Sequence, residues 1–301
     1  MPAPPLCTTS MMRRTTMSAP PTVGFVGLGN LGLAMATRLV HRGFAVVATD
    51  LSAHRSRRIT EEGGTAASVA DVLACETVCV ATPDDRAVLA MLDDGTLGPG
   101  AGVRRLLLHS TVLPTAARAL ADRLTPLGIS LLEVPVSGGP SAAHAGELAL
   151  FLGGEDDHLD AASEVLDALG SRQFRLGPIG AGSAVKLVNQ LTMLAAVDAL
   201  HEGLALTRIF EVPANAALEA LAAATGDTWV GRNWGFFDAI VADYDESGTA
   251  EDERPWRKDL TEFMDASRAV SLPSPLAEHL RGSVGARIEE DARANRKGHA
   301  A

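Results

Sequence analysis

Short apolar runs alternate with amphipathic segments through the first part of the chain. The runs begin near positions 22, 45, 77, 105 and 129, and segments of helical spacing separate them; further strands are expected at 145–153 and 174–176. Almost wholly apolar runs bounded by turn residues are typical of strands buried on both faces of a sheet. Their alternation with helices predicts a doubly wound parallel sheet over residues 21–180.

The rest of the chain shows helical periodicity and no strand pattern. From Ser183 to Phe210 apolar residues cover most of a helical circumference, and more helices are expected at 214–224, from Pro255, and at 276–292. A helix that is apolar on nearly every side is normally buried, so we expect the long one between domains or subunits. The pattern predicts an all-α domain over 181–292, built on one long interdomain helix, with a frayed tail at 293–301.

Two stretches lie between those helices. The aromatic residues at 229–237 fit a hydrophobic core or, as the alternative, a ligand pocket in which Trp229 or Trp234 touches substrate. The acidic stretch from Asp243 to Glu253 is typical of a solvated loop.

Composition and charge exclude several classes of protein. The chain is 47% apolar and 21% charged, which is typical of a globular protein. A net charge of −11 and a pI near 5.2 disfavour nucleic acid and anionic membrane surfaces as partners. No apolar run is long enough to span a bilayer. An anionic substrate would therefore need a local positive site.

The cysteines and the first twenty residues give indications of the cellular compartment. Cys7, Cys75 and Cys79 form neither a disulfide framework nor a metal-ligand cluster, so we expect a reducing cytoplasm and no metal. Residues 1–20 are rich in Pro, Ser and Thr and lack the apolar core of a secretory signal. A disordered extension is expected there, with a basic transit peptide as the alternative.

A glycine motif follows the first predicted strand and opens a helix. Its six residues are Gly27, Leu28, Gly29, Asn30, Leu31 and Gly32, in the pattern GxGxxG. In this context the glycines permit a tight turn, let the backbone approach a pyrophosphate, and bring helix and strand together. The motif therefore predicts a dinucleotide site with phosphate at the helix N-terminus.

Asp50 ends the next predicted strand, about twenty residues after the glycines. A carboxylate there accepts hydrogen bonds from the adenosine ribose and repels the 2′-phosphate of NADP. We therefore expect NAD, although Arg55, Arg57 and Arg58 are close enough to keep NADP possible. An ordinary helix N-cap is the alternative role for Asp50.

Other polar residues fall at the predicted carboxyl ends of strands, where such sheets bind ligands. They are Thr82-Pro83, Ser110-Thr111 and Ser137-Gly138-Gly139. The paired glycines let successive backbone N–H groups converge on a carboxylate, and the serine adds a donor. Helix capping for the first two pairs and a plain loop for the third are the alternatives.

Lysine is scarce in this chain, so its positions are informative. Only Lys186, Lys258 and Lys297 occur, although arginine is plentiful. Lys186 lies among apolar residues of the long helix, where burial can lower the pKa of an amine until it exchanges protons near neutrality. A lysine that snorkels from a helix end is the alternative. Asn189 follows three residues later and projects from the same helix face.

Several motifs now stand in a fixed order: Gly27–Gly32, Pro135-Val-Ser-Gly-Gly139, Gly180-Ala-Gly-Ser-Ala-Val-Lys186-Leu-Val-Asn189-Gln190 and Lys258-Asp-Leu260. Over about residues 21–290 this order resembles the β-hydroxyacid dehydrogenases, the family of 3-hydroxyisobutyrate dehydrogenase and tartronate semialdehyde reductase. The resemblance implies a Rossmann domain, an all-helical domain, an NAD(P)-dependent reaction and a homodimer or homotetramer.

The resemblance also implies roles for single residues. Lys186 matches the catalytic lysine and Asn189 the substrate-orienting amide, while Ser137, Gly138 and Gly139 match the loop that holds the substrate carboxylate. Thr111 matches a residue beside the nicotinamide and substrate, and Lys258 a lysine near the cofactor. Two positions depart from the family: Glu133 replaces the usual aspartate, and Gln190 follows Asn189 where many members repeat asparagine.

These roles define a reaction. A neutral Lys186 would accept the hydroxyl proton as hydride leaves for the nicotinamide, and its ammonium form would protonate the alkoxide in reduction. A carboxylate held at 137–139 and a hydroxyl near Lys186 describe a small β-hydroxy acid, such as 3-hydroxyisobutyrate.

Three alternative functions remain. Imine reductases share the architecture but usually place aspartate or tyrosine where Lys186 stands. A non-catalytic NAD-binding protein is a second alternative, which the retained Lys186, Asn189 and Lys258 disfavour. A decarboxylating reaction like that of 6-phosphogluconate dehydrogenase is disfavoured because the chain is short and its second half offers no obvious phosphate site.

Overall fold

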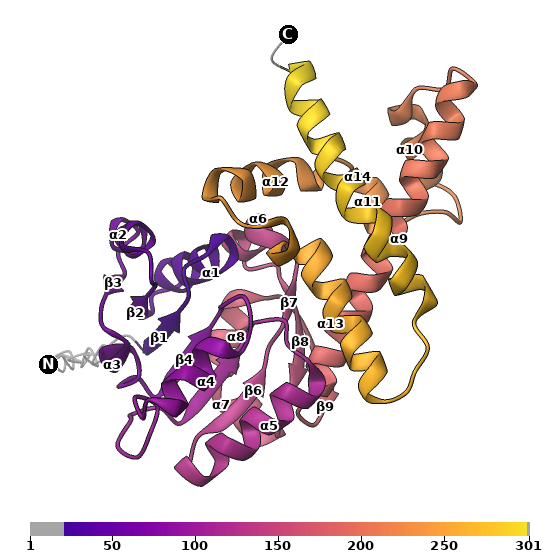
Figure 1. The fold of residues 1–301 in the computed structure, drawn as a ribbon. Coiled ribbons are helices and arrows are strands. Elements are labelled where there is room, and N and C mark those ends of the chain that lie inside the picture. The colour runs from indigo at the N-terminus through magenta and orange to yellow at the C-terminus, as the bar shows by residue number, and fades with distance from the viewer. Residues whose placement is uncertain (1–20, 300–301) are drawn as a thin grey trace, which may run out of the picture.

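The chain folds into a sheet-based part and a helical part that rises beside it (Figure 1). The computed structural model describes residues 21–299, so the extension expected at 1–20 lies outside the described residues. The long helix α9 (Ala181–Ile209) begins against the sheet and runs away from it through the helical part.

Nine strands within residues 21–299 form one mostly parallel sheet. They are β1 (Thr22–Val26), β2 (Ala45–Thr49), β3 (Thr65–Ala66), β4 (Thr77–Val80), β5 (Arg105–Leu108), β6 (Ser130–Glu133), β7 (Val136–Ser137), β8 (Ala149–Gly153) and β9 (Arg172–Gly177). Their order is β3-β2-β1-β4-β5-β6-β8-β7, with β9 beside β8. The first six strands in this order are parallel and follow the Rossmann order, which confirms the predicted fold class. The antiparallel pairing of β8 with β6 and β7 adds an edge that the sequence pattern did not predict.

Helices cover both faces of this sheet. They are α1 (Asn30–His41), α2 (Ala53–Glu61), α3 (Val69–Val72), α4 (Arg86–Asp93), α5 (Pro114–Leu124), η1 (Thr125–Leu127), α6 (Gly139–Ala145), α7 (Asp156–Ala161) and α8 (Ser163–Leu169). Leu39 of α1 and Leu166 of α8 are buried on one face, and Val88 of α4 and Leu120 of α5 on the other. Burial on both faces explains why the strands are almost wholly apolar.

The remaining helices pack on α9 around a second core. They are α10 (Ala214–Ala222), α11 (Trp229–Arg232), α12 (Phe236–Ser247), η2 (Glu251–Glu253), α13 (Pro255–Ala269) and α14 (Pro275–His299). Trp256 is the largest buried side chain of this core, and the rings of Phe237 and Tyr244 meet it edge-on. The aromatic cluster is therefore partly core, as its favoured interpretation predicted.

Three boundaries differ from the sequence expectation. The Ser-Gly-Gly-Pro stretch passes from β7 through Gly138 directly into α6, since Pro140 suits the first turn of a helix; we call the connection at Ser137–Gly139 the Ser137 loop. The predicted acidic loop starts inside α12, which ends only at the left-handed Gly248. The last helix extends past Ala292 to His299. Its residues Arg293 and Arg296 donate hydrogen bonds to Asp245 of α12, and these bonds hold the C-terminal part of the helix in place.

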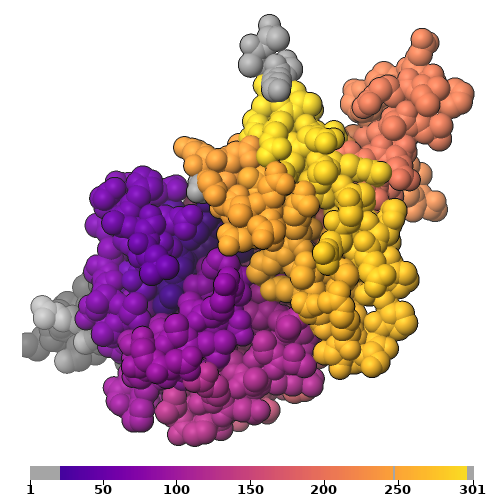
Figure 2. Space-filling model, viewed as in Figure 1, coloured from indigo at the N-terminus to yellow at the C-terminus, as the bar shows by residue number. Residues whose placement is uncertain are grey.

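The long helix is less buried than its apolar pattern suggested. Its beginning packs on β8 and β9, and its middle packs on α13 and α14. Toward its end Leu206, Ile209 and Phe210 are exposed, the last two by 76% and 72%. This end carries α10 as an arm that stands away from the rest of the molecule (Figures 1 and 2).

Candidate active site

The glycine turn between β1 and α1 has the geometry of a phosphate-binding turn. Gly27 has a φ of 92°, and a Cβ there would lie 2.6 Å from the Ala81 carbonyl oxygen. A Cβ on Gly32 would lie 2.1 Å from the Gly27 carbonyl oxygen, whereas no described atom comes within 4 Å of the Cβ position of Gly29. Two glycines thus allow close packing, and the third leaves the backbone open to a ligand.

Asp50 lies beside that turn. Its carboxylate accepts hydrogen bonds from the backbone N–H groups of Leu28 and Ser52, both at 2.7 Å. Ser52, not Asp50, is the N-cap of α2, so the alternative role for Asp50 does not apply. The Arg55 guanidinium comes within 3.9 Å of the carboxylate. The turn, the carboxylate and open backbone together fit the adenosine and pyrophosphate of a dinucleotide.

The ends of β4 and β5 lie next to the glycine turn. The Thr82 hydroxyl donates to the Asp84 carbonyl oxygen at 2.6 Å and lies 3.2 Å from the Ser110 hydroxyl. The turn at Thr82-Pro83 and the Ser110-Thr111 pair are thereby joined side by side. The Thr111 carbonyl oxygen accepts a hydrogen bond from the Lys258 ammonium of α13 at 3.2 Å. Figure 2 shows this face hollowed between the first part of the chain and the orange region of α12 and α13.

Lys186 reaches from α9 to Val136, the first residue of β7. Its amine nitrogen donates to the Val136 carbonyl oxygen at 2.9 Å and to the Gln190 side-chain oxygen at 3.0 Å. Val136 directly precedes Ser137, so the lysine and the predicted carboxylate loop lie together. The Asn189 amide donates to the same Gln190 oxygen at 3.0 Å. Lys186 therefore does not snorkel from the helix end, and its hydrogen-bond partners are uncharged.

Burial lowers the pKa of Lys186, and this is the largest influence on it. The charge of Asp259 acts in the opposite sense and raises the pKa, while the charge of Lys258 lowers it further. Burial disfavours the ammonium form because the charged group loses water. The amine thus has the property that a proton-exchanging group needs.

The loop at Ser137 has a backbone that only glycine adopts easily. Gly138 and Gly139 have φ values of 137° and 72°. A Cβ on Gly139 would lie 3.1 Å from the ring of Phe236, at the start of α12. An aromatic ring of the helical part therefore faces the loop, a neighbour that the sequence pattern did not identify.

Lys258 is held differently from Lys186. Its ammonium lies 2.7 Å from a Glu262 carboxylate oxygen and 3.7 Å from one of Asp259. Burial raises the pKa of Glu262 to about 7, and the Lys258 charge opposes the rise. The sequence pattern did not point to Glu262, because an acid four residues after a lysine is usual on exposed helices.

Glu133 supports the start of α9. It is fully buried, and its carboxylate accepts hydrogen bonds from the backbone N–H groups of Gly180 and Ser183 and from the Ser183 hydroxyl. A carboxylate is favourable at a helix N-terminus because it satisfies free N–H groups and opposes the helix dipole. Glu133 thus fixes the helix that carries Lys186. A lone acid in an otherwise apolar strand was the available sequence signal.

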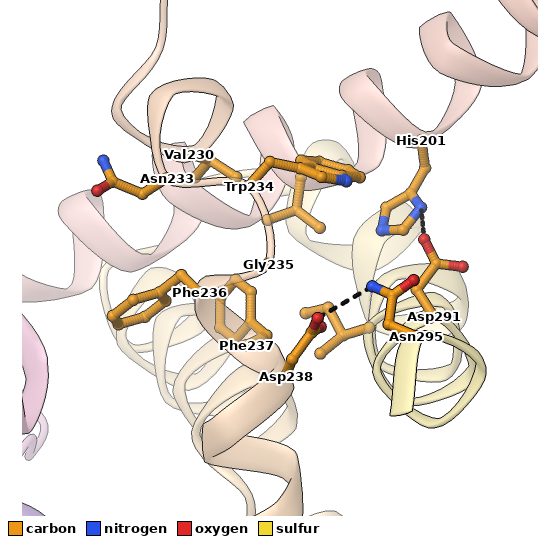
Figure 3. Close-up of a pocket in the computed structure, with 12 residues that line it drawn as sticks. His201, Val230, Asn233, Trp234, Gly235, Phe236, Phe237, Asp238, Asp291 and Asn295 are labelled. Atoms are coloured by element: carbon orange, nitrogen blue, oxygen red, sulfur yellow. Dashed lines mark hydrogen bonds and ion pairs between the residues drawn. The ribbon is translucent and has the colours of Figure 1, made fainter. Parts of the chain in front are cut away.

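A pocket lies in the helical part, between α9, α12 and α14, and Phe236 is one of the residues that line it (Figure 3). His201 points across it to Asp291 at 3.0 Å, and Asp238 accepts a hydrogen bond from Asn295 at 3.0 Å. His201 is fifteen residues after Lys186, so along the helix the two are about 22 Å apart. Trp234 lines this pocket, and Trp229 does not.

Residues 21–299 contain neither a candidate metal site nor a candidate membrane span. No three His, Cys, Asp or Glu side chains among these residues gather where they could hold a metal ion. Within the same range, none of the helices is long and apolar enough to cross a membrane.

Family profiles match both parts of the chain. The NAD-binding domain of 6-phosphogluconate dehydrogenase matches residues 22–177. The NAD-binding domain of NADP-dependent 3-hydroxyisobutyrate dehydrogenase matches residues 180–300.

Individual relatives cover nearly the whole chain. An L-threonate dehydrogenase of Cupriavidus necator is 31% identical over 85% of this chain and 86% of its own length. A 3-hydroxyisobutyrate dehydrogenase of Pseudomonas aeruginosa is 30% identical over 90% of this chain and 93% of its own. The crystal structure of 3-hydroxyisobutyrate dehydrogenase from Salmonella typhimurium is 28% identical, has a TM-score of 0.72, and covers 87% of this chain and 92% of its own. The chain therefore belongs to the β-hydroxyacid dehydrogenase family of NAD(P)-dependent oxidoreductases, of which 3-hydroxyisobutyrate dehydrogenase is a member.

Proposed function

We propose that the protein transfers a hydride between NAD and a small β-hydroxy acid of the 3-hydroxyisobutyrate type, with Lys186 as general acid and base. One observation carries this proposal: the Lys186 amine lies 2.9 Å from the carbonyl oxygen of Val136, immediately before the Ser137 loop. A substrate carboxylate on that loop would place its β-hydroxyl within reach of the amine. The other proposed roles are carboxylate binding at Ser137–Gly139, substrate orientation by Asn189, and contacts from Thr111 and Lys258.

The amine exchanges the proton, and the nicotinamide, when bound, accepts or supplies the hydride. In oxidation a neutral Lys186 takes the hydroxyl proton as the C–H bond breaks. In reduction its ammonium form returns that proton to the forming alkoxide. Burial keeps the neutral form accessible, and the nearby Asp259 charge keeps the ammonium form accessible.

The Phe236 ring supports an acid with an apolar substituent. The ring faces Gly139 and packs edge-on against Trp229 and Phe237. Burying a methyl group against this ring costs little free energy. The extra hydroxyl groups of threonate would lose their hydrogen bonds to water there and would find no partner in the ring. We therefore place 3-hydroxyisobutyrate ahead of threonate as substrate.

Asp50 supports NAD as the preferred cofactor. Its carboxylate is bound by two backbone N–H groups and would repel a 2′-phosphate. Replacing Asp50 with serine should lower the ratio of kcat/KM for NAD to that for NADP at least about tenfold, since a charge-assisted hydrogen bond contributes about 1.5–3 kcal/mol. An unchanged ratio would assign ribose recognition to other residues.

The exposed end of α9 supports a homodimer or homotetramer through the helical domain. Leu206, Ile209, Phe210 and Trp229 leave apolar surface uncovered in one chain. Light scattering should give at least twice the chain mass, and Phe210→Glu should reduce it. We further propose the division into a dinucleotide domain at 21–180 and a helical domain from 181, supported by the start of α9 at Ala181; the helical domain includes α14 to His299 and so extends past the expected end at 292.

We also propose a cytoplasmic location, supported by the free thiols of Cys75 and Cys79.

A substrate panel tests the proposal. The purified chain is assayed with NAD and NADP on 3-hydroxyisobutyrate, threonate, glycerate, 3-hydroxypropionate and a cyclic imine. The expected result is the highest kcat/KM for 3-hydroxyisobutyrate with NAD. Turnover of the imine alone would establish an imine reductase, and NAD binding without any turnover would establish a non-catalytic binding protein.

A further inference from the structure

Gln190 joins Lys186 to a buried carboxylate. Its side-chain oxygen accepts the hydrogen bond from Lys186, and its side-chain nitrogen donates to an oxygen of Asp259 at 2.5 Å. Gln190 and Asp259 are 7% and 4% exposed. The connection spans α9 and α13, so it also ties the two helices together beside the site.

The carboxylate fixes which way the amide faces. An ionised carboxylate only accepts hydrogen bonds, so the NH₂ group of Gln190 must face Asp259. The amide oxygen must then face Lys186 and Asn189, both of which donate to it. Gln190 therefore always presents an acceptor to the Lys186 amine.

This acceptor restricts the amine nitrogen, which has four tetrahedral directions. One holds Cε, and two N–H bonds point to Val136 and Gln190. The fourth direction carries a proton in the ammonium form and the lone pair in the neutral form. The amine therefore uses the same direction in both reactions: it donates a proton there in reduction and accepts one there in oxidation.

We propose that Gln190 is a positioning residue for the reaction: tied to Asp259, it aims the reacting direction of the Lys186 amine and holds the Asp259 carboxylate near it. The proposal rests on the proposed role of Lys186 as general acid and base. It assigns Gln190 no contact with substrate, and so differs from the orienting role proposed for Asn189.

Side-chain length is the feature that the first variant tests. Gln190→Asn keeps the amide but shortens the side chain by one C–C bond, about 1.5 Å, so it cannot reach Lys186 and Asp259 together. Gln173→Asn is a matched control, because Gln173 also donates to a carboxylate, that of Asp167 at 2.7 Å, on the exposed strand β9.

The expected kcat of Gln190→Asn is about 100-fold below wild type, because a misplacement of about 1 Å can cost that much. NAD affinity, measured by calorimetry, stays unchanged, and Gln173→Asn keeps the wild-type kcat. Equal kcat values for Gln190→Asn and wild type would overturn the proposal, even if the melting temperature fell.

Charge is the feature that the second variant tests. Asp259→Asn can still accept from Gln190, so it keeps the orientation and removes one negative charge near Lys186. The other charges that act on the amine, those of Lys258 and Glu262 on α13, remain. Asp265→Asn, on an exposed turn of the same helix, is the control.

The measurement is the pH dependence of kcat/KM in both directions. Loss of a negative charge favours the neutral amine. Asp259→Asn should therefore shift the rising limb of oxidation and the falling limb of reduction together to lower pH, by about one unit. A profile that coincides with wild type and Asp265→Asn would overturn the coupling.

Lys186→Arg separates this proposal from the one on which it rests. If Lys186→Arg turns over substrate like wild type, the proposed function fails. If Lys186→Arg is inactive and Gln190→Asn is fully active, only the positioning role fails.

Discussion

Lys186 and Lys258 lie on neighbouring helices, and the difference between their surroundings indicates different uses of the same side chain. Lys186 donates to a carbonyl oxygen and an amide oxygen, neither of which carries a charge. Lys258 pairs directly with the Glu262 carboxylate. A lysine with neutral partners can lose its proton without leaving a buried carboxylate unpaired, whereas a paired lysine supplies a fixed positive charge. The first arrangement suits proton exchange, and the second suits binding of an anionic cofactor.

The largest expected effect comes from replacing Lys186 with arginine, and the same replacement of Lys258 is the comparison. Arginine cannot act as a base near neutral pH. Lys186→Arg should lower kcat by about 10² to 10⁴-fold, the usual contribution of proton transfer. Lys258→Arg keeps the positive charge and should retain most of kcat. Steady-state kinetics with NAD-binding calorimetry measures both, and similar losses in the two variants would remove the distinction between them.

The next effect concerns the loop beside Lys186. Ser137→Ala removes the donor that we propose for the substrate carboxylate, and it should raise KM for the acid about 10-fold or more, since such a bond contributes about 1.5–3 kcal/mol. Adding Gly139→Val should raise KM further, because its φ of 72° and the Phe236 ring leave no room for a side chain.

Ser141→Ala, on the exposed side of α6, is the control for that loop and should keep the wild-type KM. NAD affinity should be unchanged in all three variants. A loss of NAD affinity in Ser137→Ala would instead place the loop at the cofactor.

A smaller effect is expected where α9 is held in place. Glu133→Gln keeps the shape but removes the charge that the Gly180 and Ser183 groups bind. The free energy of unfolding should fall by about 1.5–3 kcal/mol. Chemical denaturation measures it, with Glu147→Gln on the exposed surface as control. Equal stability of the two variants would contradict the proposed support of the Lys186 helix.

The smallest effect concerns the partner of Lys258. The pKa of Glu262 is raised to about 7, so between pH 4.5 and about 7 the folded state holds a proton that the unfolded state has lost. The stability that this proton contributes is present at low pH and is lost as pH rises through that window. Glu262→Gln should remove this pH dependence, worth about 1–3 kcal/mol. A melting temperature that varies with pH as in wild type would exclude Glu262 as its origin.

Much of the fold could be predicted from local patterns in the sequence. Buried parallel strands are apolar along their whole length, and Gly27 and Gly32 are required by close backbone packing, so both features are visible in the sequence. The end of α12 and the extension of α14 were missed because Asp245 meets Arg293 and Arg296 only after folding. Contacts between distant segments leave no periodic signal.

The candidate site was predictable to a similar degree. Lys186 stood out as a rare lysine in an apolar helix, and in the structure its amine contacts Val136, next to the Ser137 loop. Gln190 was noticed only as a departure from the family. Its link to Asp259 joins positions that are 69 residues apart, and nothing in the spacing indicates it. Phe236 likewise belonged to an aromatic cluster that fitted a core equally well.

The most direct test of proton exchange by Lys186 is the pH dependence of kcat/KM in oxidation and reduction on the same enzyme. With a neutral amine as base, oxidation should rise with pH, and with an ammonium as acid, reduction should fall. Both limbs should report one pKa below the usual lysine value of about 10.4. The residual activity of Lys186→Arg could show the same pH dependence as wild type, or the two directions could report two unrelated pKa values. Either result would contradict proton exchange by Lys186.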